Sequence, residues 1–255
     1  MIKFILLGHG RSGSTLVVKS LAQHPNIRMA GELFHESQDE RKRAFEGLNR
    51  TYPPDKAEKH YYLEDTDGAK FLREDVFYER PWPEIRAAGF KLFYVHARNH
   101  SETRKAWPYL LENKDIRVLH LVRTNNLESF LSLKLALLTK EWKRWKNSQT
   151  ERAEPPLLTL DPKECRAYFD EKRVWRDWAR ASFSDHPFFE FEYERDVCRR
   201  FQPLMHDIHD FLDVPRAPAS ELLEKQARKP PREQIANYDE LKEYFRYTPH
   251  EEFFV

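Results

Sequence analysis

Short apolar runs alternate along the chain with longer segments in which apolar residues recur at helical spacing. The apolar runs have the length and composition of buried parallel strands, and they occupy residues 2–7, 26–30, 89–95, 116–122 and 188–192. Helices are predicted over residues 14–24, 65–88 (with an interruption at Pro81-Trp82-Pro83), 102–113, 127–145, 161–184 and 194–212, and a last helix opens at 237–241. This alternation predicts an α/β fold in which a parallel sheet carries helices on both faces.

Several helix boundaries carry local signals. The first helix is expected to end near His24, because the residue before a proline is pushed out of helical geometry. Asp161 is a predicted N-cap, with Pro162 at the first helical position and Glu164 as the capping-box partner. Residues 36–62 are charged and predict a polar helix followed by an irregular surface loop.

Length and composition predict one domain with a packed core. A chain of 255 residues, with 40% hydrophobic and 14% aromatic residues, is long enough to bury such a core. We therefore predict a single domain over residues 1–255, with insertions at roughly 36–88 and 140–160. Four tryptophans at helical spacings predict core packing between two helices, with the border of a pocket as the alternative: Trp142, Trp145, Trp175 and Trp178.

Charge and cysteine content narrow the class of protein. The net charge of +1 argues against general binding of nucleic acid or membrane, so any basic site must be local. Cys165 and Cys198 lack a metal-type spacing, and a reduced, cytoplasmic environment fits them best, with a single disulfide as the alternative. No apolar run approaches the ~18–20 residues needed to cross a bilayer, so we expect no transmembrane segment.

A glycine-rich turn joins the first predicted strand to the first predicted helix. Gly8-x-x-x-x-Gly13-Ser14-Thr15 matches the P-loop pattern G-x-x-x-x-G-K-[ST] except that Ser14 replaces the lysine, while Arg11 places a basic group inside the loop. Backbone N–H groups and the positive end of the helix dipole converge in such a turn, which favours phosphate. The sequence therefore predicts a P-loop-like sheet that binds a nucleotide, and the missing lysine disfavours a kinase or ATPase.

Chemistry-bearing residues follow three of the predicted strands. Ligands of parallel sheets bind outside the carboxyl ends of the strands, so these residues are expected at one edge. Glu32 and His35 follow the second strand, and Arg123 ends the strand at 116–122. On the helix after Arg123, Ser129 and Ser132 offer hydroxyl groups. A further histidine, His96, follows the strand at 89–95.

These motifs resemble those of the PAPS-dependent sulfotransferase family. Arg11-Ser-Gly-Ser-Thr15 followed by Gln23-His-Pro-Asn-Ile-Arg-Met-Ala-Gly-Glu32 resembles the start of the bacterial trehalose and Nod-factor enzymes and of the Golgi carbohydrate and tyrosylprotein branch. Val118-Leu-His-Leu-Val-Arg123 followed by Ser132 resembles the 3′-phosphate-binding strand and helix of the family. Phe191-Glu-Tyr193-Glu194 and the tail from Lys225 to Leu241 resemble later family segments.

The resemblance implies a donor, two anion sites and a base. Gly10, Ser12, Gly13, Ser14 and Thr15 would hold the 5′-phosphosulfate of PAPS (3′-phosphoadenosine 5′-phosphosulfate). Arg11 would stabilise the leaving oxygen, and Arg123 with Ser132 would hold the 3′-phosphate. Glu32 would deprotonate a hydroxyl of a small-molecule or glycan acceptor, and the product of the donor would be PAP. No metal is expected, because Arg11 and the backbone amides would already neutralise the leaving group, and the sequence shows no CxxC or clustered-carboxylate spacing.

The sequence leaves several assignments open. His35 and His96 are alternative bases. The serine that partners the 3′-arginine in the family falls eight residues on, where this chain has Leu131, so Ser129 competes with Ser132. Tyr193 is a core residue or an adenine contact. The glycine-rich basic loop of cytosolic members is absent, and the residues considered as replacements are Lys225, Arg228 and Arg232.

Two other functions compete with sulfuryl transfer. A P-loop kinase with a displaced basic residue would need Mg²⁺ and a strand ending in aspartate, whereas the strand at 116–122 ends in Arg123. A non-catalytic nucleotide-binding protein of the same fold would tolerate loss of Glu32. The identity of the acceptor and the oligomeric state cannot be inferred from the sequence.

Overall fold

The computed structural model describes residues 1–46, 66–78, 84–142, 157–219 and 229–254. The chain forms two compact units, each with its own core. The first unit comprises Met1–Val122 and Trp178–Glu221, and the second comprises Arg123–Asp177 and Leu222–Val255. The prediction of a single domain stays a prediction. Much of both predicted insertions, residues 47–65, 79–83 and 143–156, lies outside the described residues.

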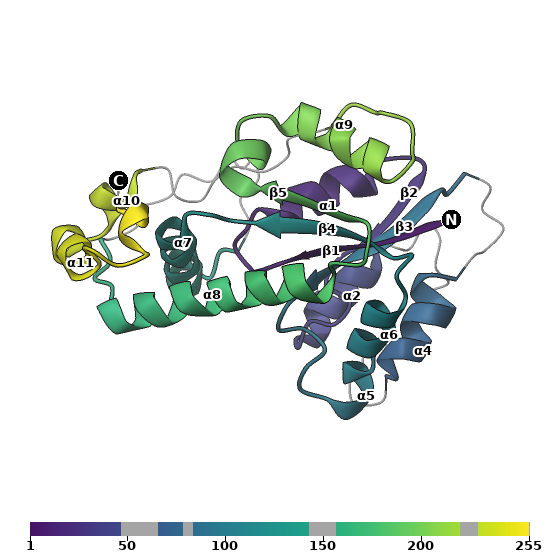
Figure 1. Ribbon diagram of the computed structural model, residues 1–255, viewed down its shortest axis with the longest axis horizontal. Coiled ribbons are helices and arrows are strands. Elements are labelled where there is room, and N and C mark those ends of the chain that lie inside the picture. Colours follow the sequence, from purple (N-terminus) through teal and green to yellow (C-terminus); the bar gives the residue numbers. More distant parts are fainter. Residues whose placement is uncertain (47–65, 79–83, 143–156, 220–228, 255) are drawn as a thin grey trace. The chain divides into compact units, whose positions relative to one another are not determined.

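A five-stranded parallel sheet forms the centre of the first unit (Figure 1). The strands lie in the order β2-β3-β1-β4-β5. Their bounds are β1 Ile2–Gly8, β2 Ile27–Ala30, β3 Ala87–Phe93, β4 Arg117–Val122 and β5 Phe188–Glu192. In the register of the central strand, Gly8 is opposite Phe93 on one side and Leu121 on the other, so the carboxyl ends of β1, β3 and β4 meet at one edge.

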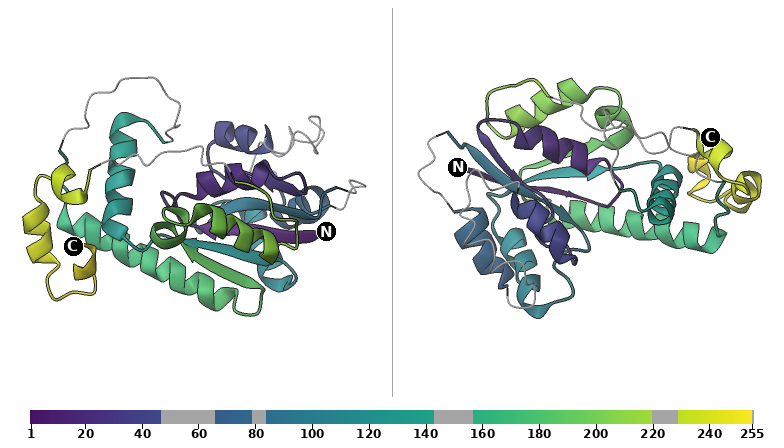
Figure 2. Two further views of the ribbon diagram at one scale, coloured as in Figure 1. Left: turned by 90° about the horizontal axis from the view of Figure 1, so that it is seen from above. Right: turned by 180° about the vertical axis from the view of Figure 1, so that it is seen from behind.

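Helices cover both faces of this sheet (Figures 1 and 2). On one face, α1 (Ser14–Ala22) and α9 (Phe201–Phe211) bury apolar side chains against Phe4 and Leu6 of β1. The other face carries α2 (Gln38–Glu46), α4 (Gly68–Phe71) and α6 (Ala106–Glu112). Phe34 fills this second layer, with its ring edge against Phe71 and Phe90. The predicted fold class, a parallel sheet flanked by helices on both faces, is confirmed.

Some predicted boundaries in the first unit are wrong. The helix predicted over 65–88 is much shorter: α4 passes into a π-helical turn, η2 (Leu72–Val76), and β3 already begins at Ala87. The helix predicted over 102–113 is two helices, α5 (Ser101–Arg104) and α6, and Pro108 lies in the first turn of α6, where its missing N–H costs no helical bond. The helix predicted from residue 194 begins with a π-helical turn, η3 (Tyr193–Val197), before α9.

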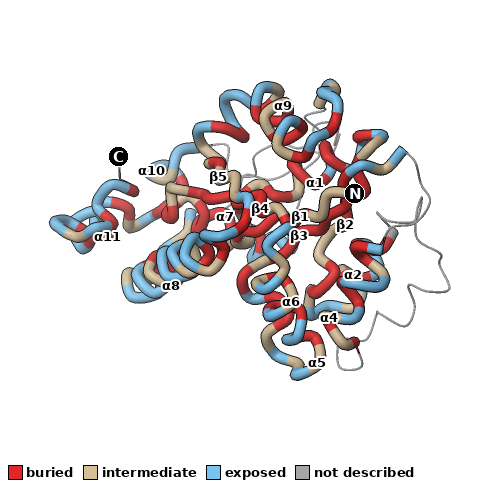
Figure 3. The backbone as a smooth tube through the Cα atoms, turned by 45° about the vertical axis from the view of Figure 1, so that its right-hand side comes forward, coloured by how far each residue is buried: buried red, intermediate tan, exposed pale blue. Residues whose placement is uncertain are grey.

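The second unit is a helical cluster. It contains α7 (Asn126–Thr139), α8 (Pro162–Ser182) as far as Asp177, α10 (Pro231–Gln234), α11 (Tyr238–Tyr244) and the short η4 (Glu251–Phe253). Its core joins Leu127, Leu131, Phe169 and Phe245, all fully buried; Figure 3 shows buried positions along both units. Among the described residues of this unit, the core is built by helix packing, with an isolated parallel bridge between Leu158 and Ile235 in place of a sheet.

Sequence signals for the second unit are partly confirmed. Asp161 caps α8, since its carboxylate accepts the backbone N–H groups of Lys163 and Glu164. The capping-box role of Glu164 is wrong, because its carboxylate pairs with Lys134 at 2.6 Å. Helix α7 ends at Thr139, six residues before the predicted end, where Lys140 takes a left-handed conformation with φ 59°.

The predicted tryptophan core is wrong in part. Trp142 is 49% exposed, whereas Trp178 packs edge-on against Trp107 in the first unit. Trp145 lies outside the described residues. Both cysteines are free thiols, Cys165 buried and Cys198 exposed. In the described parts of the chain, no helix is both long and apolar enough to span a membrane.

Candidate active site

The glycine-rich loop between β1 and α1 has an open, irregular backbone. Arg11 and Gly13 both take left-handed conformations, with φ 63° and 81°. A side chain at Gly13 would meet the Tyr193 ring at 2.5 Å, so glycine is needed there for both conformation and space. Ser12 donates its hydroxyl to the carbonyl of His9 at 2.7 Å, which shapes the turn. No side chain caps the N-terminus of α1, so its backbone N–H groups can serve an anion.

Glu32 is held beside the third strand by backbone pairing. The backbone N–H of Lys91 in β3 donates to the carbonyl of Gly31, directly before Glu32. A Cβ on Gly31 would stand 3.1 Å from Ala44 of α2, so glycine lets that helix pack closely against the segment after β2. The pairing places Glu32 level with Lys91, two residues before the end of β3.

Lys91 links the Glu32 carboxylate to the glycine-rich loop. Its ammonium lies 2.6 Å from Oε1 of Glu32 and 3.5 Å from Oγ1 of Thr15. Both charged side chains are largely buried, with 6% of Lys91 and 16% of Glu32 exposed. Because solvent screens a buried pair poorly, this contact is much stronger than one on the surface.

The sequence analysis did not identify Lys91 as a site residue. A signal was present, because a lysine interrupts an otherwise apolar strand, and a lysine in a buried strand needs an anionic or polar partner. Only the strand order, with β3 between β2 and β1, shows that its partners are the segment after β2 and the loop after β1.

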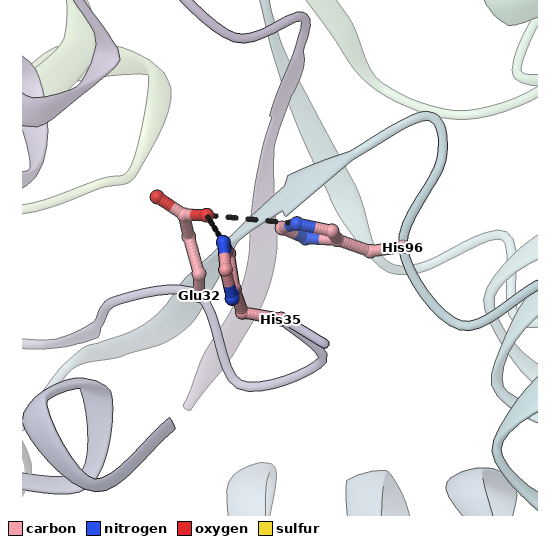
Figure 4. A group of neighbouring side chains, drawn as sticks. All are labelled: Glu32, His35 and His96. Atoms are coloured by element: carbon pink, nitrogen blue, oxygen red, sulfur yellow. Dashed lines mark ion pairs between the residues drawn. The ribbon is translucent and has the colours of Figure 1, made fainter. Parts of the chain in front are cut away.

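Two histidines face the second oxygen of Glu32 (Figure 4). The Nε2 atom of His96 lies 3.5 Å from Oε2, and that of His35 lies 3.8 Å from it. In each ring Nδ1 accepts a backbone N–H, from Phe93 for His96 and from Ser37 for His35. A neutral imidazole whose Nδ1 is an acceptor carries its hydrogen on Nε2. In its neutral form, each ring therefore directs an N–H, and not a lone pair, toward the carboxylate.

The charges around Glu32 keep it ionised. Burial alone would raise the pKa of Glu32, but the charges of Lys91 and His96 and the hydrogen bond from Lys91 together hold it below its ordinary value. Burial lowers the pKa of His96 to about 4, against the opposing effect of Glu32. Near neutral pH the group is therefore an ionised carboxylate with a lysine at one oxygen and a neutral His96 at the other.

Glu32, His35 and His96 also have the donor types and proximity of a metal site. Their potential ligand atoms lie within 4.8 Å of one another, a grouping that their sequence spacing did not suggest. A histidine that binds a metal through Nε2 carries a hydrogen on Nδ1 and donates it to an acceptor. Here both Nδ1 atoms accept backbone N–H groups, and Lys91 occupies Oε1. The hydrogen bonding of the group thus fits a carboxylate held by donors better than a metal centre.

A buried polar chain supports the turn that carries His96. Tyr94 pairs with Nε2 of His120 at 2.5 Å, and Nδ1 of His120 lies 2.9 Å from Glu190 on the adjacent strand. Arg180 donates to both oxygens of Glu190 at 2.9 and 2.6 Å. Burial opposes ionisation of Glu190, but the hydrogen bonds from Arg180 and His120 lower its pKa to about 2. The turn after β3 is therefore anchored to β4 and β5.

The predicted 3′-phosphate residues begin the second unit. Arg123 directly follows the last residue of β4, and its guanidinium donates to Glu128 at 3.0 Å. Ser129 is fully buried and shares a hydrogen bond with the Tyr168 hydroxyl at 2.9 Å. It also accepts a hydrogen bond from the ammonium of Lys172 at 2.7 Å. Ser132 is buried three residues further along α7.

The predicted site residues thus fall into three groups. The first unit brings Glu32, His35 and His96 together and connects them through Lys91 to Thr15. Tyr193 packs against Gly13 of the glycine-rich loop. The second unit holds Arg123 and the two serines, and Lys225 and Arg228 lie outside the described residues.

Comparison with known proteins gives three findings. A family model described as "Sulfotransferase family" matches residues 4–218. Two proteins named nodulation protein H, from Rhizobium meliloti (strain 1021) and Rhizobium tropici, are each 27% identical to this chain over 98% of its length, and the matches cover 94% and 92% of those proteins. The crystal structure of a sulfotransferase from Alicyclobacillus acidocaldarius matches 100% of this chain and 94% of its own, with a TM-score of 0.50 at 16% identity.

The structural match supports the fold. The family model begins within β1 and extends past β5, so it includes the glycine-rich loop, Glu32, Lys91 and Arg123. Because that match spans most of the chain, the protein belongs to the sulfotransferase family.

Proposed function

We propose that the protein transfers a sulfuryl group from PAPS to a hydroxyl group of a carbohydrate or another alcohol, with Glu32 as the general base. The observation that carries this proposal is the position of Lys91, 2.6 Å from the Glu32 carboxylate and 3.5 Å from Thr15 in the glycine-rich loop. A potential base and a potential phosphosulfate loop thus share one buried cation.

Donor binding would use two groups of residues. The backbone N–H groups of residues 12–15 at the uncapped start of α1, with the Ser14 and Thr15 hydroxyls, would bind the 5′-phosphate end of PAPS. Arg11 would face the oxygen that bridges phosphorus and sulfur. Arg123 and Ser132 would bind the 3′-phosphate through charge-assisted hydrogen bonds.

The chemical step is an in-line displacement at sulfur. A lone pair of the acceptor oxygen forms a new bond to sulfur, while the bond from sulfur to the bridging oxygen breaks and its electrons pass to the phosphate of the departing PAP. The acceptor proton moves to Glu32. Arg11 would stabilise the charge growing on the bridging oxygen, and Lys91 the charge on the sulfuryl oxygens in transit. Such electrostatic stabilisation usually contributes more to catalysis than any other single effect.

The lowered pKa of Glu32 is compatible with this role. A carboxylate of low pKa removes a proton poorly from a free alcohol. The acceptor oxygen becomes strongly acidic as its bond to sulfur forms, so a weak base suffices once transfer is under way. The same environment disfavours His35 and His96 as bases, since each neutral ring directs an N–H toward Glu32.

A transfer assay with radiolabelled PAPS and a panel of sugars, simple alcohols and phenols tests the proposal. We expect labelled product with at least one sugar or alcohol, without added divalent metal. Calorimetry should show binding of PAP in the presence of EDTA. Equal or tighter binding of ATP, or a requirement for Mg²⁺, would instead indicate a kinase, and binding of PAP without transfer to any acceptor would indicate a nucleotide-binding protein.

A further inference from the structure

A buried lysine of the second unit lies beside the predicted 3′-phosphate residues. Lys172, in the middle of α8, is 7% exposed. Its ammonium donates to the Ser129 hydroxyl at 2.7 Å and lies 5.2 Å from the centre of the Tyr168 ring. The Ser129 and Tyr168 hydroxyls are themselves hydrogen bonded at 2.9 Å. A positive charge is thus held at a fixed position against α7, inside the helical cluster.

The same part of α7 carries the other residues of interest. Ser129 and Ser132 are three positions apart, so they are neighbours on one face of the helix. Glu128 and Ser132 are four positions apart and are also neighbours, and Glu128 pairs with Arg123 at 3.0 Å. Lys172, Ser129, Ser132 and Arg123 therefore converge on the first two turns of α7.

The charges of this region suggest what the lysine does. Glu128 balances the single positive charge of Arg123, so these two residues together bring no net charge to a phosphate. A phosphate monoester carries about −1.5 to −2 charges near neutral pH. Lys172 places a second cation beside this region, and because solvent screens a buried charge weakly, its attraction for a nearby phosphate is strong.

We propose that Lys172 is a binding residue for the 3′-phosphate of the nucleotide, acting with Arg123 and Ser132, and that Ser129 positions the lysine and does not itself bind phosphate. This inference rests on the proposed function, since it needs a donor with a 3′-phosphate. It gives the two serines different roles, since the Ser129 hydroxyl contacts the ammonium of Lys172 and the hydroxyl of Tyr168.

Calorimetry with two nucleotides tests the assignment. PAP carries a 3′-phosphate, whereas adenosine 5′-phosphate is the same molecule without it. Replacing Lys172→Met should weaken PAP binding by about tenfold to a hundredfold, the range for loss of one charged hydrogen bond, while adenosine 5′-phosphate binding changes by less than about twofold. Lys172→Arg keeps the charge and should retain most of the preference for PAP.

Two further variants keep the test decisive. Ser129→Ala removes the hydroxyl that holds the lysine and should give a smaller loss that is again selective for PAP; it decides the question if Lys172→Met does not fold. Lys134→Met is the matched control, because it removes a half-exposed lysine of α7 that pairs with Glu164, and both affinities should stay within about twofold.

The pattern of losses across the two nucleotides decides the inference. A loss for PAP alone supports it. An equal loss for both nucleotides, or no loss for either, overturns it. If the proposed function itself is wrong, a different result is expected: the unaltered protein would bind PAP no more tightly than adenosine 5′-phosphate.

Discussion

The two units hold their positive charges in contrasting ways. In the first unit, Lys91 is committed to a carboxylate, and both sit at the carboxyl ends of parallel strands beside an irregular loop. In the second unit, the ammonium of Lys172 donates to a serine hydroxyl and lies near a tyrosine ring, among packed helices. The first arrangement suits a place where a proton and a negative charge move during a reaction. The second suits a place that holds one fixed anion.

This contrast predicts that the two regions control different quantities. Substitutions around Glu32 and Lys91 should lower the rate of the chemical step and leave nucleotide affinity nearly unchanged. Substitutions around Arg123 and Lys172 should weaken nucleotide binding and leave the rate at saturating PAPS nearly unchanged. A substitution in one region that changes the quantity assigned to the other would break this division.

The largest effect is expected from Glu32→Gln. The amide has nearly the same shape but cannot accept the proton, so kcat should fall by about 10²–10⁴-fold, the usual contribution of a general base. PAP affinity, measured by calorimetry, should change by less than about threefold. Glu36→Gln is the matched control, because Glu36 is an exposed carboxylate four residues on that pairs with Asn99 and His100, and its loss should leave kcat nearly unchanged.

Retention of the rate in Glu32→Gln would move the base elsewhere. His35 and His96 would then have to be reconsidered, despite the backbone hydrogen bonds that place their ring hydrogens on Nε2.

Lys91→Met should give the next largest effect. Loss of one preorganised charge at a transition state typically costs about 10²–10³-fold in kcat. The substitution also removes the main partner that lowers the pKa of Glu32, so burial would prevail and the pKa would rise. The acid limb of the rate profile should therefore shift to higher pH, a change that simple misfolding would not produce. Lys91→Arg keeps the charge, so it should retain more of the rate, and the acid limb of its pH–rate profile should stay near that of the unaltered protein.

Arg123→Ala should act mainly on affinity. Its removal takes away a charged hydrogen-bond donor and leaves the carboxylate of Glu128 near the phosphate, so PAP should bind about tenfold to a hundredfold more weakly. The affinity for adenosine 5′-phosphate should change much less. A fall in kcat at saturating PAPS comparable to that of Lys91→Met would contradict the division between the two units.

The sequence predicted the sheet and the glycine-rich loop because their signals are local. Strand β5 was predicted to the residue, and Asp161 was identified as an N-cap from its own neighbours. The contacts of Lys91 and Lys172 were not predicted because their partners, Glu32 and Ser129, lie 59 and 43 residues away in the sequence. Such contacts depend on the order in which the strands pair and on the faces through which the helices pack. Neither can be predicted from the sequence of a single segment.

The end of α7 shows a second limit. Apolar residues continue at helical spacing past Thr139, and Leu137 and Leu138 are nonetheless exposed, so periodicity alone did not reveal where packing stops. Propensity and periodicity indicate which face a helix could bury. Where the helix ends depends on which other parts of the chain pack against that face.

A further predicted effect concerns stability in mild acid and not activity, and it should arise in the first unit. Burial lowers the pKa of His96 and of His209 to about 4 in each case, the latter with help from the charges of His24 and His206. The unfolded chain has a histidine pKa near 6.5. As the pH falls, the unfolded state binds these protons before the folded state does. The free energy of unfolding is therefore at its full value above about pH 6.5 and decreases as the pH drops toward 4.

At pH 5 the loss should be about 2 kcal/mol for each histidine, an order-of-magnitude figure set by the size of the shift. His209→Gln keeps a polar acceptor for the backbone N–H of Ala217 and should flatten this dependence in urea unfolding measured between pH 7.5 and 4.5. His100→Gln is the control, because His100 is a partly exposed histidine of the first unit that pairs with Glu36 and does not contribute to the pKa of His209. The His209 ring packs against that of His24, with the ring centres 4.7 Å apart. If the slope is unchanged in His209→Gln, the acid sensitivity of the first unit does not arise at this contact, and the prediction is wrong.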